Sequence, residues 1–262
     1  MELIGYFLSV LIGISLGLIG GGGSILTVPV LVYLFSVDAL SATVYSLFVV
    51  GFTSLVGSIA YFRKRMVNMR VALLFGVPSI AMVLLTRGII IPAIPQTVFT
   101  IGNYAVTKSA LSMIFFSVLM IVASYSMIRK QQAISDKKHI ISYATILFQG
   151  ALTGVVTGLV GAGGGFLIIP ALAVLLKLPM KTAVGTSLVI IAVNSLIGFA
   201  ISYHEVVINW QLLISTVLAS LIGILLGMSF SRKIEGAKLK PVFGWFVLVM
   251  GIFILIKETL FR

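Results

Sequence analysis

The chain has 262 residues, of which 60% are hydrophobic and only 9% are charged. A mean hydropathy of +1.23 excludes an ordinary soluble globular protein and indicates an all-α polytopic membrane protein in a lipid bilayer. The net charge of +12 does not indicate nucleic acid as a partner. The lysines and arginines lie in short loops between apolar runs, and no soluble domain is present to carry a nucleic-acid-binding fold.

Eight apolar runs, separated by short polar segments, divide the chain into two similar halves and a linker. The first half, 1–128, is predicted to hold a long segment at 3–35 and helices at 39–62, 71–87 and 110–128. A basic cytoplasmic linker is predicted at 129–139. The second half, 140–262, is predicted to hold a long segment at 142–176 and helices at 181–203, 211–230 and 241–260. Because one crossing needs about 20 residues, each long segment is either one broken helix or a hairpin of two arms.

A glycine cluster lies in the middle of each long segment. Residues 17–29, Gly-Leu-Ile-Gly-Gly-Gly-Gly-Ser-Ile-Leu-Thr-Val-Pro, return 141 residues later as Gly-Leu-Val-Gly-Ala-Gly-Gly-Gly-Phe-Leu-Ile-Ile-Pro at 158–170. The match continues without a gap to Phe62 and Tyr203. Each glycine in a helix interior costs about 1 kcal/mol relative to alanine, so we expect the helix to break at both clusters. A duplicated break in corresponding membrane segments is the best sequence indication of a transporter's binding site.

The distribution of positive charge favours the hairpin interpretation. If all eight runs crossed once, the 18 lysines and arginines would divide ten against eight. If both long segments turn back at their glycines, fourteen lie on one side, and the other side keeps only Arg87, Lys108, Lys257 and Arg262. This second distribution obeys the positive-inside rule. It predicts two inverted repeats, each a glycine-broken hairpin plus three transmembrane helices, with both termini outside the cell membrane.

The two hairpins are predicted to form a cradle for an anion. Non-helical backbone in a membrane must be buried in protein or line a water-filled cavity, and the arm after each glycine cluster begins with unsatisfied N–H groups and a partial positive charge. Glycine also lets the backbone approach a ligand closely. The predicted binding residues are Gly20, Gly21, Gly22, Gly23, Ser24, Gly161, Ala162, Gly163, Gly164 and Gly165. The alternative is that these glycines only allow close helix packing.

A stripe of small and polar residues follows each hairpin at helical spacing. Its polar members, Ser46 and Thr53 in the first half and Ser187 and Asn194 in the second, complete the predicted binding site. Such a stripe either lines a hydrophilic path or supports tight helix contacts, and the serines fit both interpretations equally. Asn194 favours a path, because a buried amide is costly without a hydrogen-bond partner.

The chain offers little for catalysis or for a metal site. It contains no cysteine, two histidines and six acidic residues, and no acidic residue lies well inside an apolar run. We therefore expect no enzyme activity, no catalytic residues, no metal and no cofactor. The usual proton carrier of a transporter, an intramembrane carboxylate, is also missing from the sequence.

The doubled motif resembles the sulfite exporter TauE/SafE family, also called the TSUP permeases. The stretch that carries the resemblance most specifically is 158–170 together with Ala183-Val-Gly-Thr-Ser-Leu188, and the first copy is looser, with Ser24 in place of the last glycine. The resemblance implies transport of small sulfur-containing anions such as sulfite, sulfonates or sulfoacetate across the cytoplasmic membrane.

We therefore expect a secondary transporter that binds a small sulfur-containing oxyanion between the hairpins at mid-membrane and works by alternating access. Two alternatives share the sequence pattern: an anion channel of the same architecture and a non-transporting membrane scaffold. The identity of the anion, the direction of transport, the coupling ion and the oligomeric state are left open.

Overall fold

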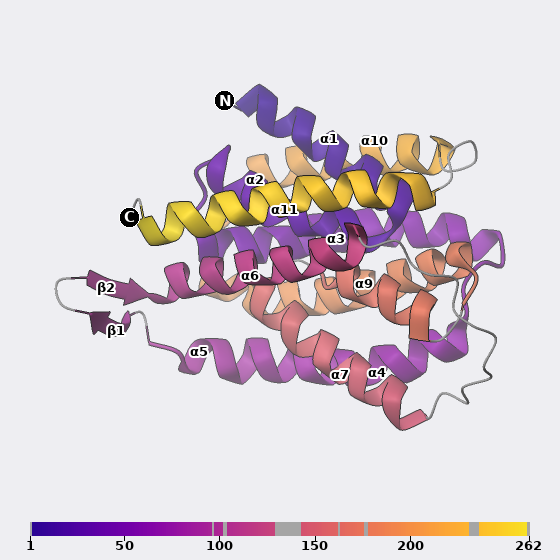
Figure 1. Ribbon diagram of the computed structural model, residues 1–262, viewed down its shortest axis with the longest axis horizontal. Helices are drawn as coiled ribbons and strands as arrows, with labels where there is room; N and C mark the ends of the chain where they lie inside the picture. The colour runs from indigo at the N-terminus through magenta and orange to yellow at the C-terminus, as the bar shows by residue number, and fades with distance from the viewer. Residues whose placement is uncertain are drawn as a thin grey trace.

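The computed structural model describes residues 2–95, 97–101, 104–128, 143–161, 163–175, 178–230 and 236–260. Within these ranges the regular structure is helical apart from one short antiparallel hairpin (Figure 1). The expected all-α membrane class is confirmed. The predicted linker 129–139 lies outside the described residues.

The first half of the chain contains the following elements in order: α1 (Glu2–Ile19), the 3₁₀ turn η1 (Gly21–Leu26), α2 (Thr27–Tyr33), α3 (Ala39–Arg63), α4 (Met69–Leu85), the π-helical turn η2 (Thr86–Ile90), α5 (Ile91–Ala93), β1 (Thr97–Ile101), β2 (Tyr104–Thr107) and α6 (Lys108–Ile128). The second half contains α7 (Tyr143–Val160), α8 (Gly165–Pro170), the π-helical turn η3 (Ala171–Leu175), α9 (Met180–Ser202), the 3₁₀ turn η4 (Tyr203–Glu205), α10 (Trp210–Phe230) and α11 (Gly236–Leu260). Helix α3 begins at Ala39, as expected for 39–62, whereas α11 is described from Gly236, five residues before the predicted 241, and the β1–β2 hairpin was not predicted.

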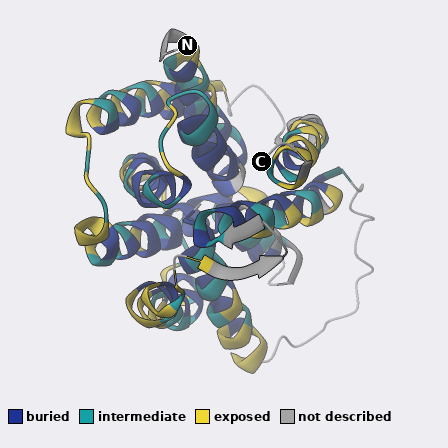
Figure 2. Cartoon of the chain, turned by 90° about the vertical axis from the view of Figure 1, so that its left-hand side faces the viewer, coloured by how far each residue is buried: buried dark blue, intermediate teal, exposed yellow. Residues whose placement is uncertain are grey.

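The outer faces of the helices are suited to lipid. Among the described residues, six helices are long and apolar enough to cross a bilayer: Ala39–Arg63, Met69–Ala93, Lys108–Tyr125, Tyr143–Val160, Met180–Glu205 and Trp210–Phe230. Large apolar side chains such as Val77, Phe148 and Val249 are 60–69% exposed, and Figure 2 shows that the exposed residues lie on the outer faces of the peripheral helices. An aqueous surface rarely carries so many exposed apolar groups, whereas hydrocarbon chains solvate them without cost.

Both long segments break at their glycines. Helix α1 ends before Gly20, whose φ of 82° and ψ of −134° are open only to glycine. The chain then returns, because the ring centroid of Phe35, just after α2, lies 5.1 Å from that of Tyr6 near the start of α1. Helix α7 likewise ends at Val160, before a turn with three glycines of positive φ.

Three pairs of long helices correspond between the two halves. The starts of α1 and α7, of α3 and α9, and of α4 and α10 are each separated by the same 141 residues that relate the glycine clusters. The correspondence extends beyond the sequence match to the helix caps: Asn68 Oδ1 accepts from Val71 N at 3.1 Å, and Asn209 Oδ1 accepts from Leu212 N at 3.1 Å. An asparagine N-cap thus begins the same helix in each half.

The equivalent helices α3 and α9 pack against each other in antiparallel directions. Tyr45, near the start of α3, donates from Oη to Val207 O at 3.0 Å and accepts from Asn209 N at 2.6 Å, beyond the end of α9. Thr186, near the start of α9 and matched to Tyr45, accepts from Asn68 N at 3.0 Å, beyond the end of α3. Each central helix therefore holds the loop that follows the other.

The first arm of each hairpin packs on a helix of the other half through glycine. A Cβ added to Gly13 of α1 would lie 2.1 Å from Ser220 O of α10, and one added to Gly154 of α7 would lie 2.2 Å from Ser79 O of α4. These close backbone contacts are typical of small-residue packing in membranes. They join the two halves into one helical body around the α3–α9 pair.

Candidate functional site

The two glycine clusters meet in the interior of the protein. A Cβ added to Gly21 would lie 2.1 Å from the Cα atom of Gly165, and one added to Gly165 would lie 2.3 Å from the Cα atom of Gly21. The chain therefore touches itself backbone to backbone at this point, and no side chain separates the two hairpins. Contact this close also fits the packing interpretation of the glycines.

Positive φ angles make four of these positions specific for glycine. They are Gly20 (82°), Gly161 (72°), Gly163 (67°) and Gly164 (65°). L-residues reach this region only at a cost of about 1–2 kcal/mol. A Cβ on Gly163 would in addition lie 2.7 Å from Val50 Cγ1 and 2.8 Å from Ser195 Oγ.

The remaining cradle residues are placed as follows. Gly22 lies within η1, and Ser24 is fully buried and donates from Oγ to Gly21 O at 2.7 Å. A Cβ on Gly23 would lie 2.0 Å from Ser15 Oγ of α1. Ala162 lies outside the described residues.

The four stripe residues are all fully buried at the α3–α9 contact. Two of them are satisfied within their own helix, since Thr53 donates to Val49 O at 2.6 Å and Ser187 donates to Val184 O at 2.8 Å. Asn194 Nδ2 donates to Ser79 Oγ at 2.6 Å and so joins α9 to α4. Asn194 Oδ1 and Ser46 Oγ have no hydrogen-bond partner, which leaves two acceptors available in this region.

Two further buried hydroxyls lie directly against the second glycine cluster. A Cβ on Gly164 would lie 2.0 Å from Thr157 Oγ1, and Gly163 faces Ser195 Oγ in the same way. Neither oxygen has a hydrogen-bond partner. Buried polar groups are nearly always bonded, so these two hydroxyls beside the glycines lack the partner that such groups normally have.

A buried arginine, which the sequence did not place in the site, lies beside the second glycine cluster. Arg87, in η2, is only 2% exposed. Its Nη1 donates to Thr43 Oγ1 at 3.3 Å, whereas Nε and Nη2 have no partner. A Cβ on Gly161 would lie 2.8 Å from Arg87 Nη2, so the guanidinium rests against the glycine cluster. In the sequence Arg87 ends the predicted helix 71–87, where a cation is expected at the membrane surface.

Arg87 lines a cavity of about 410 Å³. Two other charged residues line this cavity. Lys108 is buried and donates from Nζ to Ile91 O, and Glu205 is exposed. The rest of the wall is mainly apolar and includes Leu40, Val44 and Ile91. The cavity opens toward solvent at the exposed residues Pro92, Pro95 and Glu205.

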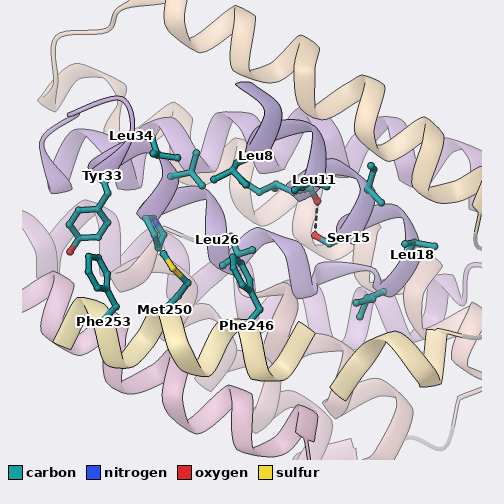
Figure 3. A pocket seen from close by; sticks show the side chains of 15 residues that line it. Leu8, Leu11, Ser15, Leu18, Leu26, Tyr33, Leu34, Phe246, Met250 and Phe253 are labelled. Atoms are coloured by element: carbon teal, nitrogen blue, oxygen red, sulfur yellow. Dashed lines mark hydrogen bonds between the residues drawn. The ribbon is translucent and has the colours of Figure 1, made fainter. Parts of the chain in front are cut away.

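A larger groove of about 710 Å³ lies between α1, α2 and α11 (Figure 3). Leu11, Phe246 and Phe253 line it and are themselves 42–50% exposed on the lipid-facing side. The hydroxyl of Ser15 there already donates to Ile12 O at 2.8 Å. Transfer of an anion next to hydrocarbon without donors is prohibitively costly, so we assign no anion site to this groove.

The comparisons with known proteins agree with this architecture. A family model described as "Sulfite exporter TauE/SafE" matches residues 6–254. A probable membrane transporter protein of Xylella fastidiosa (strain Temecula1) is 28% identical over 258 residues, covering 94% of this chain and 91% of its own. The probable membrane transporter protein YunE of Bacillus subtilis is 28% identical over 259 residues, covering 89% and 90%. The probable membrane transporter protein MJ0441 of Methanocaldococcus jannaschii is 26% identical over 266 residues, covering 94% and 92%.

No solved structure matches the chain significantly. The family model spans nearly all of the sequence, including both glycine clusters, the α3–α9 pair and Arg87. Among the described residues, no three His, Asp or Glu side chains come together as a metal site requires. The chain is a multi-pass membrane transporter and belongs to the sulfite exporter TauE/SafE family.

Proposed function

We propose that this protein is a secondary transporter of a small sulfur-containing oxyanion, of the sulfite, sulfonate or sulfoacetate type, in the cell membrane. The observation that carries the proposal is the meeting of the two glycine clusters, at Gly21 and Gly165, among buried hydroxyls that have no partner. Backbone N–H groups and hydroxyls suit a weakly basic oxyanion that must be bound and then released.

We propose that the halves are inverted repeats with both termini outside. The antiparallel packing of the equivalent helices α3 and α9 supports this. So does the crosswise pairing, in which α1 packs on α10 and its equivalent α7 packs on α4. In Figure 1 both chain termini lie at the end that also carries α5 and the β1–β2 hairpin, the end that the charge distribution assigns to the outside.

In this proposal the glycine contact is the closed gate of an alternating-access cycle. When one half moves relative to the other, Gly21 and Gly165 separate, and the N–H groups at 22–24 and 163–165 become available to the anion. The polar atoms of Ser46 and Asn194 lie along the same helix pair as secondary acceptors for water on the path. Binding between two repeats at mid-membrane is the common arrangement of secondary transporters.

The test is transport by the purified protein in liposomes. Labelled sulfite, sulfoacetate and a simple sulfonate are offered in turn, and uptake is measured against concentration and with unlabelled anion inside. We expect saturable uptake and acceleration by internal anion, which a transporter gives and a channel does not. Linear uptake without counterflow would favour the channel alternative, and absence of flux for all three anions would refute the proposal.

A further inference from the structure

The cavity around Arg87 combines a fully buried, incompletely bonded cation with contact to the glycine clusters. The side chain is 2% exposed and has two nitrogen atoms, Nε and Nη2, without a hydrogen-bond partner. Glu205, at the rim of the same cavity, is the opposite charge that acts on Arg87, but among the described residues no carboxylate forms a direct ion pair with the guanidinium. A buried ion of this kind is costly unless a counter-ion joins it.

We infer that this cavity, which we call the Arg87 cavity, binds the transported anion before or after it passes the glycine contact. The inference rests on the proposed function in that the cargo is an oxyanion. Arg87 and Lys108 both line the cavity, and a guanidinium beside an ammonium suits the oxygens of a sulfonate, sulfite or carboxylate group. A volume of about 410 Å³ holds such a group together with a short organic tail.

The position of Arg87 links this cavity to the glycine gate. Its Nη2 atom occupies the space that a Cβ on Gly161 would need, at 2.8 Å, and Thr43 borders the same glycine at 2.6 Å. An anion held by the guanidinium therefore lies next to the turn that begins the second glycine cluster. The anion therefore moves only a short distance between the Arg87 cavity and the glycine contact.

The second half of the molecule shows that the fold itself does not require this charge. The residues that correspond to Arg87, Thr43 and Gly161 through the repeat are Met228, Val184 and Gly20. There a Cβ on Gly20 would meet Ile169 Cδ1 at 2.5 Å and Val184 Cγ1 at 3.2 Å, and Met228 packs against the Val184 cluster. The corresponding place in the second half is therefore filled by apolar side chains, without a buried charge.

The charge balance of the cavity suits a ligand that must also leave. Arg87 and Lys108 contribute two positive charges, and Glu205 at the rim contributes one negative charge. The net charge of one attracts an anion, whereas the carboxylate competes with it for the cations. Binding strong enough to load the site yet weak enough to release the cargo is the general requirement for conduction.

The test compares anion binding to full-length wild-type protein and to variants in detergent, with sulfite as the probe and chloride as the reference anion. Arg87→Gln should weaken sulfite binding at least about tenfold, the effect of losing charge-assisted hydrogen bonds. The sulfite affinity of Arg87→Lys should lie between those of the wild type and Arg87→Gln, because an ammonium keeps the positive charge but loses the paired donors of the guanidinium. Lys257→Gln is the matched control: Lys257 is a cation of the same end, exposed above the Tyr33 ring, and its loss should leave the affinity unchanged.

Glu205→Gln keeps the inference testable even if Arg87→Gln does not fold. Removing the competing charge should tighten sulfite binding about two- to fivefold, a modest effect because the rim is exposed to solvent. Wild-type affinity in both Arg87→Gln and Glu205→Gln would overturn the inference. That result is distinguishable from failure of the proposed function, which would appear as absent sulfur-anion flux in the wild-type protein whatever the variants bind.

Discussion

Substitution of Gly163 by alanine tests whether the glycine turn is needed for the stability of the fold and for transport. Gly163 has a φ of 67°, and an L-residue in this region costs about 1–2 kcal/mol. The new Cβ would also lie 2.7 Å from Val50 Cγ1, 2.8 Å from Ser195 Oγ and 3.1 Å from Ile191 Cγ2. Relieving such overpacking typically costs a further 1–3 kcal/mol or so. Together these effects predict a loss of about 2–5 kcal/mol in the free energy of unfolding.

The measurement is thermal unfolding of the purified protein, followed by transport in liposomes. The expected loss corresponds to a melting temperature lower by about 5–15 °C and to strongly reduced flux. Gly76→Ala is the control, because its Cβ would meet only Ile190 Cγ1 at 3.9 Å within helix α4. We expect Gly76→Ala to have the melting temperature and the flux of the wild type. If Gly163→Ala also matches the wild type in both measurements, the role assigned to the turn is wrong.

Three further predictions concern the stripe, the topology and the source of the binding energy. Asn194→Leu removes the bond to Ser79 Oγ and should weaken transport by about 1–3 kcal/mol in a protein that still inserts normally; unchanged affinity would return the stripe to a packing role. A single cysteine at Ser135, which lies outside the described residues, should react with impermeant label only from the cytoplasmic side, and labelling from outside would exclude the inverted topology. Neutralising Lys181 should leave anion affinity nearly intact, whereas Gly163→Val should abolish it; a large effect of Lys181→Gln on equilibrium binding would contradict a backbone-based cradle.

Local sequence rules predicted the helical elements well because the rules themselves are local. Glycine clusters break helices wherever they stand, and apolar runs of suitable length form membrane helices in either half. The predicted ends at 39–62 and 211–230 differ by one residue from α3 and α10. The β1–β2 hairpin was missed although the sequence carries a local signal for it, two runs of β-branched and aromatic residues on either side of Gly102-Asn103.

The contents of the site were less predictable because they depend on contacts between distant segments. Arg87 was assigned to an outer loop by charge counting, and only its approach to Thr43 and Gly161 shows that it is buried. The reciprocal bonds of Tyr45 and Thr186 likewise join residues more than a hundred positions apart.

The unequal bonds of Tyr45 and Thr186 have an energetic consequence for the conformational equilibrium. At one end of the α3–α9 pair the Tyr45 hydroxyl makes two hydrogen bonds to the opposite loop, whereas at the other end Thr186 makes one. Opening the Tyr45 end therefore breaks one more bond, worth about 1 kcal/mol net. In the proposed alternating-access cycle, this difference taken alone corresponds to a population ratio of about five in favour of opening at the Thr186 end. A protein built from two matched halves can thus favour one resting state because one half has a tyrosine where the other has a threonine.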